Sequence, residues 1–335
     1  GYSIYFDTRP VYDSPYPTER PLVGNGDRLR IGMKGDAGRL SVGIWGEFDV
    51  ADLDRDGDPD LWVNSGMMTA TDTDLQLGHY YFENLGRIGI AGEYVFAPGK
   101  LVKNCYGNAG FGLLSGSSSP FFVDIDRDGS LDLLYVGKYC AEWGRLGWEE
   151  DRPVILEWRA LDFGQTFDAG TSPGSSVAWN LPMATYVDWD GDGKRELVGG
   201  QYFYQNVGSD DAPRFDMASR SPLTVILERN HREVDWDGDG DLDIVAADRF
   251  PRIWLYENVG TRTDPRMAPG KVMKTYDGQE IWIPGQLNCV VPFDWDDDGD
   301  LDLLWGGEDG FIGLVENLAD PGQAPKLAQS RLVQQ

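Results

Sequence analysis

A nine-residue acidic pattern recurs five times along this chain of 335 residues. Every copy has the form D-x-D-x-D-G-x-x-[DE], with carboxylates at positions 1, 3, 5 and 9 and a glycine at position 6. Carboxylates at alternate positions of a tight turn converge on one point, and hard oxygen ligands in this number suit Ca²⁺ rather than Zn²⁺. The five copies, named loops 1 to 5 below, occupy residues 52–60, 124–132, 188–196, 235–243 and 294–302.

Five copies in the same register predict about five structural calcium sites. Each copy supplies four ligands, so the loops account for 20 of the 56 acidic residues. Solvated acidic turns are the alternative, but repetition of one spacing favours metal loops. The predicted ligands are Asp52, Asp54, Asp56, Asp60, Asp124, Asp126, Asp128, Asp132, Asp188, Asp190, Asp192, Glu196, Asp235, Asp237, Asp239, Asp243, Asp294, Asp296, Asp298 and Asp302.

Strand-like apolar segments flank every loop. One short run precedes the loop, a second follows it, and a third has the form Y-x-E-N or a relative of it, as at 79–84 and 253–258. In the second repeat this third run is degenerate and is expected at 154–162. A weaker fourth run completes each unit, and no helical periodicity is present. Four short strands per repeat predict the blade of a β-propeller.

The acidic loop between strands one and two, with the Y-x-E-N-x-G run, resembles the FG-GAP or VCBS-repeat β-propellers over roughly residues 44–327. Integrin alpha heads, some fungal lectins and several polysaccharide lyases belong to this family. The resemblance implies an all-β propeller of four-stranded blades and favours seven of them, whereas this chain alone accounts for five or six. Residues 1–43 are expected to form a degenerate blade or ring-closing strands, ahead of propeller repeats at 44–335.

Charge and composition exclude several classes of protein. Against 56 acidic residues stand 29 Lys and Arg, and the net charge of −27 disfavours nucleic acid and anionic membrane surfaces as partners. Hydrophobic residues make up 41%, enough for a folded core, and no apolar run is long enough to span a bilayer. The calcium loops fit a secreted protein, extracellular or periplasmic.

The three cysteines form no C-x-x-C pair, so a structural zinc site is not expected. Cys105 and Cys140 fall on loops of neighbouring connections and are predicted to form a disulfide, which leaves Cys289 as a free thiol. The alternative is three buried thiols.

Blade topology places two kinds of loop on the face opposite the calcium loops: those from strand two to strand three, and those from strand four to the first strand of the next blade. The long insertions all belong there, and they are 64–78, 104–119, 138–153, 168–182 and 275–290. Long loops on a rigid scaffold are where function usually lies. In related propellers this opposite face is the ligand face, so an acidic polysaccharide or another glycan is the expected partner.

The first functional hypothesis is a polysaccharide lyase that cleaves a uronate-containing glycan by β-elimination. A histidine would be the base, a tyrosine the acid, and an arginine would neutralise the uronate carboxylate. The catalytic candidates are His79, His231, Tyr80, Tyr139, Tyr202, Arg145 and Arg249. The candidates for substrate binding are Lys138, Trp143, Trp148 and Arg252.

Two alternatives stay open. A lectin or adhesion propeller would use the same aromatic residues without a base, because stacking alone binds a sugar ring. A purely structural surface protein would bind no glycan. For each arginine, an ion pair with a nearby acid is the simpler explanation in so acidic a protein.

Overall fold

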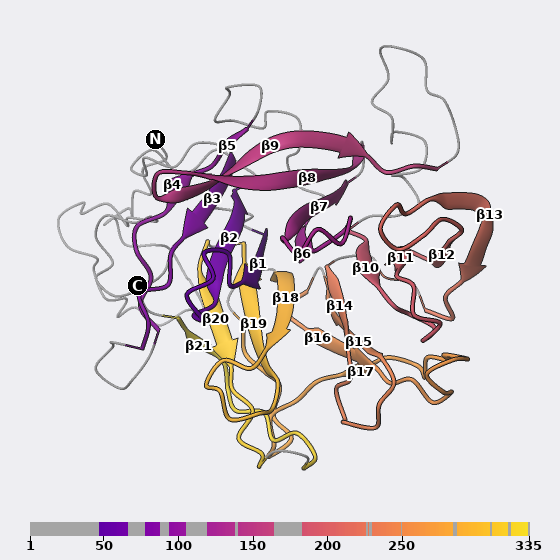
Figure 1. Ribbon diagram of the computed structural model, residues 1–335. Coiled ribbons are helices and arrows are strands. Elements are labelled where there is room, and N and C mark those ends of the chain that lie inside the picture. The colour runs from indigo at the N-terminus through magenta and orange to yellow at the C-terminus, as the bar shows by residue number, and fades with distance from the viewer. Residues whose placement is uncertain are drawn as a thin grey trace, which may run out of the picture.

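The computed structural model describes most of the chain from Glu47 onward. The described residues are 47–65, 78–87, 94–104, 119–137, 140–163, 183–225, 227, 230–248, 250–283, 287–308, 310–320 and 323–333. They form twenty-one β-strands in five sheets and contain no helix, so none that could cross a membrane (Figure 1). The segment 1–43, expected to form a degenerate blade or closing strands, lies outside the described residues.

Each sheet is one blade, and its antiparallel strands follow one another in chain order. Blade 1 consists of β1 (Glu47–Ala51), β2 (Asp60–Ser65), β3 (Gly78–Phe82) and β4 (Lys100–Leu101). Blade 2 consists of β6 (Pro120–Val123), β7 (Asp132–Gly137), β8 (Cys140–Glu149) and β9 (Arg152–Ala160). Blade 3 consists of β10 (Thr185–Val187), β11 (Glu196–Gly199), β12 (Tyr202–Asn206) and β13 (Phe215–Pro222).

The last two blades repeat this order. Blade 4 consists of β14 (His231–Val234), β15 (Asp243–Ala247), β16 (Ile253–Tyr256) and β17 (Lys271–Val272). Blade 5 consists of β18 (Leu287–Phe293), β19 (Asp302–Gly307), β20 (Ile312–Val315) and β21 (Arg331–Leu332). Blade 2 gains one more strand, β5 (Lys103–Asn104), which pairs in parallel with β9 and so attaches the end of blade 1 to the outer edge of blade 2.

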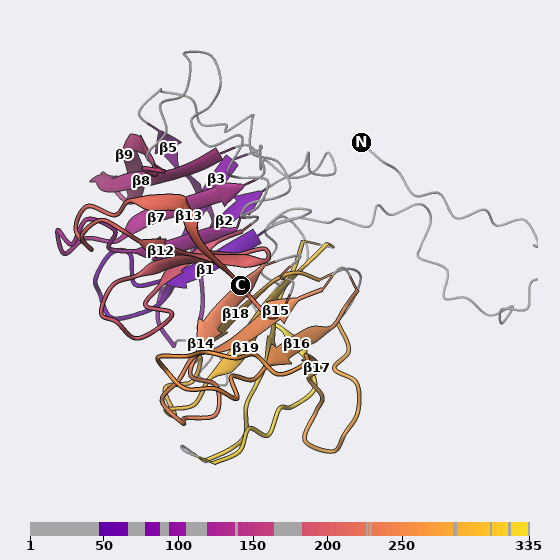
Figure 2. The ribbon, with the colours of Figure 1, turned by 90° about the vertical axis from the view of Figure 1, so that its right-hand side faces the viewer.

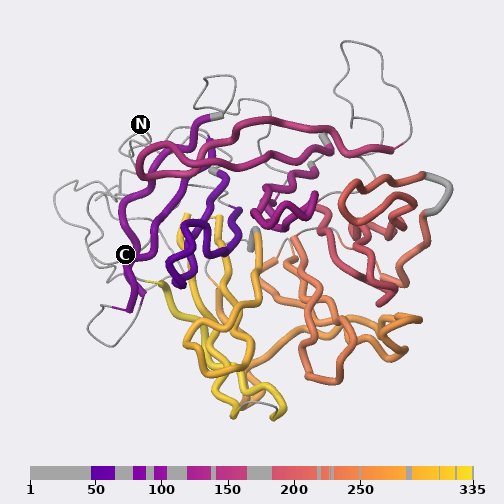
Figure 3. Tube along the Cα trace, in the orientation of Figure 1, coloured from indigo at the N-terminus to yellow at the C-terminus, as the bar shows by residue number. Residues whose placement is uncertain are grey.

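The first strands of the blades form a closed ring at the centre of the molecule. Strand β1 contacts β6 and β18, β6 contacts β10, and β14 contacts both β10 and β18. Figure 3 follows the chain around this ring, and Figure 2 shows it turned by 90°. The described residues therefore form a five-bladed β-propeller, in agreement with the number of acidic loops. A seven-bladed ring, which the family resemblance favours, would need blades that the described residues do not contain.

Five apolar clusters hold the ring together, one at each junction between neighbouring blades. They follow from the two-residue period of the strands, which sends alternate side chains to opposite sides of a sheet. In β2, Leu61 and Val63 enter the junction with blade 5, whereas Trp62 enters the junction with blade 2. In β7, Leu133 faces blade 1 and Leu134 faces blade 3. After its acidic first residue, each second strand has a run of adjacent apolar residues, because both of its faces are buried.

A buried polar group lies where the first strands meet. Arg232 of β14 donates to Asp49 Oδ1 in blade 1 and to the Pro120 carbonyl in blade 2, each at 3.0 Å. The second Asp49 oxygen accepts the main-chain N–H of Phe122 at 2.9 Å. Arg232 and Asp49 are both buried, with 6% of their surface exposed. One side chain of blade 4 thus connects to two blades that are not its neighbours.

The second repeat departs from the expected layout. Residues 138–153 were expected to be an insertion on the face opposite the calcium loops, with the third strand at 154–162. Instead β8 fills most of this segment, and β9 is the fourth strand. The turn between β8 and β9 therefore lies on the side of the acidic loops. Ala141 and Trp143 are buried and Glu142 between them is more exposed, an alternation that is typical of a strand.

Candidate functional site

All five acidic loops join the first strand of a blade to the second, as predicted, so they lie at the same ends of the strands. The glycine at position 6 has a positive φ in every loop, from +86° in Gly129 to +99° in Gly57, where glycine meets no steric penalty. The backbone at position 4 also has a positive φ in every loop, although three loops have a residue other than glycine there: Arg55, Arg127 and Asp297. The sequence pattern did not single out position 4, because its residue type varies.

Carboxylates at positions 1 and 5 shape the turn. Asp52 Oδ2 of position 1 accepts the main-chain N–H of Gly57 at 3.2 Å. Asp56 Oδ1 of position 5 accepts the N–H of Asp58, two residues on, at 2.9 Å. Such bonds from a side chain to the main chain two residues on are typical of Asx turns. The loop backbone therefore directs the acidic side chains before any ligand binds.

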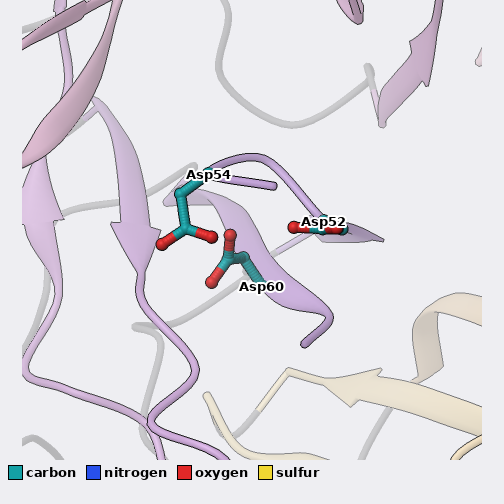
Figure 4. Close-up of side chains that lie close together, drawn as sticks. All are labelled: Asp52, Asp54 and Asp60. Carbon is teal, nitrogen blue, oxygen red and sulfur yellow. The ribbon is translucent and has the colours of Figure 1, made fainter. Parts of the chain in front are cut away.

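Three carboxylates in every loop bring ligand atoms within 4.8 Å of one another. Loops 1 to 3 do so with positions 1, 3 and 9, and loops 4 and 5 with positions 1, 3 and 5. Figure 4 shows loop 1, where the carboxylates of Asp54 and Asp60 face each other and Asp52 lies across the turn. Five predicted ligands stand outside these clusters, namely Asp56, Asp128, Asp192, Asp243 and Asp302.

The position 9 carboxylate is buried in every loop, where it accepts the main-chain N–H of position 2. Asp60 accepts from Leu53 at 3.1 Å, and Asp302 accepts from Trp295 at 3.0 Å. Burial raises the pKa of Asp60 and Asp302 to about 7 and that of Glu196 to about 8. Position 9 is therefore the residue that fixes the loop to its blade.

The asparagine of the Y-x-E-N-x-G run connects the third strand to the acidic loop. The Asn258 main-chain N–H donates to Asp243 Oδ1 at 2.7 Å. Its side-chain Oδ1 accepts the N–H of Gly260 at 3.0 Å and that of Arg266 at 2.8 Å. The same main-chain bond to position 9 recurs from Asn84 and Asn317. These bonds give the physical reason why the acidic loop and the asparagine recur together.

The acidic clusters fit a hard divalent cation. Burial raises the pKa of Asp54, and the charges of Asp56 and Asp52 raise it further. Buried carboxylate oxygens without a hydrogen-bond partner lie in other loops, among them Asp124 Oδ1 and Asp188 Oδ1. Such oxygens are costly to bury unless something positive meets them. A set of carboxylates without sulfur or imidazole suits Ca²⁺.

The pH response of the calcium-free protein tests this geometry. The folded pKa values of the position 9 carboxyls exceed the ordinary value of 3.8 for Asp, so folding takes up protons. Their stabilising contribution is complete below about pH 4 and is lost as the pH rises through about 7. We expect the thermal unfolding midpoint of the calcium-free protein to decrease as the pH is raised from about 5 to about 8. Circular dichroism would measure this midpoint.

Saturating calcium should reduce this slope, because cations then hold the ionised carboxylates. Asp302→Asn should flatten the calcium-free profile in part, since its amide does not titrate. The assignment is wrong if calcium leaves the pH profile unaltered.

Both candidate histidines lie in the interior, not on an open face as expected. His79 has no exposed surface, and its Nδ1 accepts a bond from Trp62 Nε1 at 2.9 Å. Burial lowers the pKa of His79 to about 3. His231 is equally buried, with Nε2 3.4 Å from the Val198 carbonyl and 3.4 Å from Glu233 Oε1. A base must reach the proton that it removes, and neither ring reaches the surface.

The other candidates are dispersed over the molecule. Tyr80 is buried in the junction of blades 1 and 5, Trp143 is buried under the Arg159 guanidinium, and Tyr202 is half-buried beneath Arg220. Lys138, Tyr139 and Arg249 lie outside the described residues. So does Cys105, and with it the predicted disulfide to Cys140, whereas Cys289 is a fully buried thiol.

Two candidates belong to the face of the acidic loops, which corrects their expected position. Arg145 of β8 pairs with Asp128 of loop 2 at 3.3 Å. Trp148 is 46% exposed and stands edge-on to Tyr81, with 5.7 Å between the ring centroids. Trp148 also lines a cleft of about 480 Å³, together with Asp52 and Ser130. Both residues lie near the acidic loops because β8 is a long strand.

Arg252 lies on the opposite face, at a second cleft of about 500 Å³. The turn from β15 to β16 contributes Phe250 and Arg252, and the connection from β17 to β18 contributes Trp282 and Glu280. Phe250 and Trp282 expose 62% and 66% of their surface. Arg252 lies over the Phe250 ring and pairs with Asp248 at 2.6 Å. Sequence reasoning singled out Arg252 but missed the two exposed aromatic residues beside it.

Comparison with known proteins supports the repeat pattern and the fold. Residues 235–305 match the family model of the FG-GAP-like repeat. A search of curated proteins by sequence finds no match.

Three solved structures similar to this chain have low sequence identity and low TM-scores. A lectin of Agrocybe aegerita that recognises non-reducing terminal N-acetylglucosamine is 17% identical, with a TM-score of 0.39 over 88% of this chain and 67% of that one. An alpha-L-arabinofuranosidase of Clostridium thermocellum is 10% identical, with a TM-score of 0.45 over 87% and 94%. The biofilm matrix protein Bap1 of V. cholerae is 11% identical, with a TM-score of 0.28 over 88% and 40%. With the repeat match at 235–305 and the five blades, this chain fits the FG-GAP/VCBS family of β-propellers.

Proposed function

We propose that the protein is a carbohydrate-binding β-propeller that holds structural calcium in its five acidic loops and a glycan in the cleft beside blade 4. The observation that carries this proposal is the pair of exposed aromatic rings, Phe250 and Trp282, that line one cleft with Arg252 and Glu280. Large aromatic side chains rarely stay exposed in a concave site without a partner.

The chemistry of the cleft matches a sugar. The face of a pyranose ring is apolar and stacks on an aromatic ring, while its hydroxyls need donors and acceptors nearby. Trp282 offers the ring, Arg252 offers donors and Glu280 offers acceptors. The tight Arg252–Asp248 pair removes the free positive charge that would attract a uronate. We therefore favour a neutral glycan over the acidic polysaccharide expected from the sequence.

Binding without cleavage is favoured over the lyase hypothesis. The expected bases, His79 and His231, have no exposed surface. Of the other catalytic candidates, Tyr80, Tyr202 and Arg145 are described, and none of them lines either cleft. No base, acid and neutralising cation therefore come together among the described residues. Calcium in the loops would act on stability, at the opposite ends of the strands from the cleft. A secreted location, extracellular or periplasmic, fits weak structural calcium sites.

Trp282→Ala is expected to weaken glycan binding by about tenfold or more, because a central aromatic anchor commonly contributes over about 1.4 kcal/mol. The matched control is Tyr276→Ala, since Tyr276 is 69% exposed on the same connection but does not line the cleft. A glycan array should first identify a ligand, and titration calorimetry should then compare both variants with the parent protein.

Equal losses in both variants, or none in Trp282→Ala, would remove the cleft as the binding site. The protein should also be incubated with uronate glycans in solution. An increase in absorbance would then detect unsaturated products. Turnover there would favour the lyase instead.

A further inference from the structure

The five acidic loops differ widely in charge. Loop 5 contains six aspartates and no basic residue, whereas loop 3 contains three aspartates, one glutamate, one lysine and one arginine. The formal charges are −4, −3, −2, −5 and −6 for loops 1 to 5. All five loops carry the same four acidic ligands, so the difference in charge comes from positions 4, 7 and 8. Charges so close to a bound cation change its electrostatic attraction to the loop, and the loops are therefore not equivalent sites.

Position 7 accounts for part of the difference. It is aspartate in loops 1, 4 and 5, Ser130 in loop 2 and Lys194 in loop 3. In loop 4, Asp241 is 8% exposed and its Oδ1 has no hydrogen-bond partner. Burial raises the pKa of Asp241, and the charges of Asp239 and Asp237 raise it further. In loop 5, both carboxylate oxygens of Asp300 are buried without a hydrogen-bond partner. A buried carboxylate oxygen without a hydrogen-bond partner is costly unless a cation or a proton neutralises it. Loops 2 and 3 also contain such oxygens, on Asp124, Asp126 and Asp188, but only loops 4 and 5 have them at position 7.

Arginines meet the ligand carboxylates of loops 2 and 3. In loop 2, Arg159 lies 3.5 Å from Asp126 of position 3, and Arg145 pairs with position 5. In loop 3, Arg262 lies 3.5 Å from Asp188 of position 1 and donates to the Trp189 carbonyl at 2.8 Å. Among the described residues, no ion pair reaches the ligand carboxylates of loops 4 and 5.

These guanidinium groups compete with a metal for the same oxygens. An arginine beside a ligand carboxylate already offsets part of the repulsion that a cation would relieve. The ligand carboxylates of loops 4 and 5 have no such substitute among the described residues, and these two loops carry the most charge and contain the unpartnered position 7 oxygens. In loop 5, Arg87 donates to the Trp295 carbonyl and pairs at 3.0 Å with Asp297, which is at position 4 and is not a predicted ligand.

We infer that the loops bind calcium in two classes, with loops 4 and 5 as the tight pair and loops 2 and 3 as the weak pair. This inference rests on the proposed calcium binding and adds the order in which the loops fill as the calcium concentration rises. At low free calcium, blades 4 and 5 would be held by metal, while blades 2 and 3 would rely on their arginines. Loop 1, with five aspartates and Arg55 directed to the Gly129 carbonyl, falls between the two classes.

The chain offers a built-in readout of the order. Position 2 is tryptophan in loops 3, 4 and 5, as Trp189, Trp236 and Trp295, but Leu53 and Ile125 in loops 1 and 2. Terbium, a calcium mimic, emits when a nearby tryptophan transfers its excitation. In a terbium titration of the metal-free full-length protein, the tight sites fill first and give an early phase of emission at low terbium concentration. Trp236→Phe and Trp295→Phe should each remove emission from this early phase. Trp189→Phe should remove it from the late phase.

Calorimetric titration with Ca²⁺ should show two sites at least about tenfold tighter than the weakest two. Lys194→Asp should strengthen one weak site about tenfold, and Asp241→Lys should move one tight site into the weak class. Lys274→Asp is the charge-matched control, because Lys274 is exposed and far along the chain from any loop. It should leave the titration unaltered.

Five equal sites would overturn the inference while leaving the calcium role intact. So would a Lys194→Asp titration that matches the Lys274→Asp control. Absence of any calcium or terbium binding would overturn the proposed calcium role and the inference together.

Discussion

Removal of calcium is expected to lower the thermal unfolding midpoint by about 10 °C or more. At about ten times the dissociation constant, one bound ion adds roughly 1.4 kcal/mol, so five sites add about 7 kcal/mol. For a chain of 335 residues the unfolding entropy is about 0.7 kcal/mol/K, so 1 kcal/mol moves the midpoint by about 1.5 °C. Scanning calorimetry in excess calcium and in excess chelator would measure the difference.

The physical reason is repulsion among carboxylates that the fold forces together. Each loop holds three acidic ligand atoms within 4.8 Å, and the buried position 9 carboxylate cannot turn to solvent. Without a cation, these carboxylates must take up protons or repel one another. Magnesium is the control cation, because it demands a tighter octahedral geometry and should restore less of the midpoint. An unchanged midpoint in chelator would show that the loops are solvated turns.

The blades could be predicted from the sequence because their determinants are local. Position 6 needs a glycine for its positive φ, and the asparagine of the third strand bonds to position 9 of the same blade. Such contacts lie within one repeat, so they recur as a visible pattern. The alternation in β2 likewise follows from Leu61, Trp62 and Val63 facing two different junctions.

The positions of the functional candidates could not be predicted in the same way. His79 sits on a strand that also carries Tyr81 and Phe82, and its burial follows from the contact between whole blades. Arg145 and Trp148 were misplaced because β8 is longer than the third strand of the other blades. The cleft at Trp282 depends on two connections that are distant in sequence. Only the closed ring brings such residues together.

Arg232→Met is expected to destabilise the protein by about 3–5 kcal/mol, because it leaves the buried Asp49 carboxylate without its counter-charge. The Arg232 guanidinium also donates to the Pro120 carbonyl, which would lose its partner. Equilibrium unfolding in denaturant, with saturating calcium throughout, would measure the change. Saturating calcium keeps any calcium sites in the acidic loops occupied in both proteins. The difference in unfolding free energy then comes from the contacts of Arg232 at the centre of the ring.

The matched control is Arg266→Met, which removes an exposed ion pair. Arg266 and Asp264 lie 2.7 Å apart, with 69% and 67% of their side chains exposed, and such pairs contribute less than about 1 kcal/mol. A loss at Arg232 no larger than this control would mean that the central pair does not hold the blades.

The double variant Arg232→Met with Asp49→Asn separates charge from connection. If the cost of Arg232→Met comes from the unpaired carboxylate, the double variant should recover much of the stability, because the neutral amide tolerates burial better. Recovery would be incomplete, since the introduced amide would still lack the Arg232 bond that joins blade 4 to blade 1. The part that is not recovered is the contribution of a single side chain that reaches across the ring to blades 1 and 2.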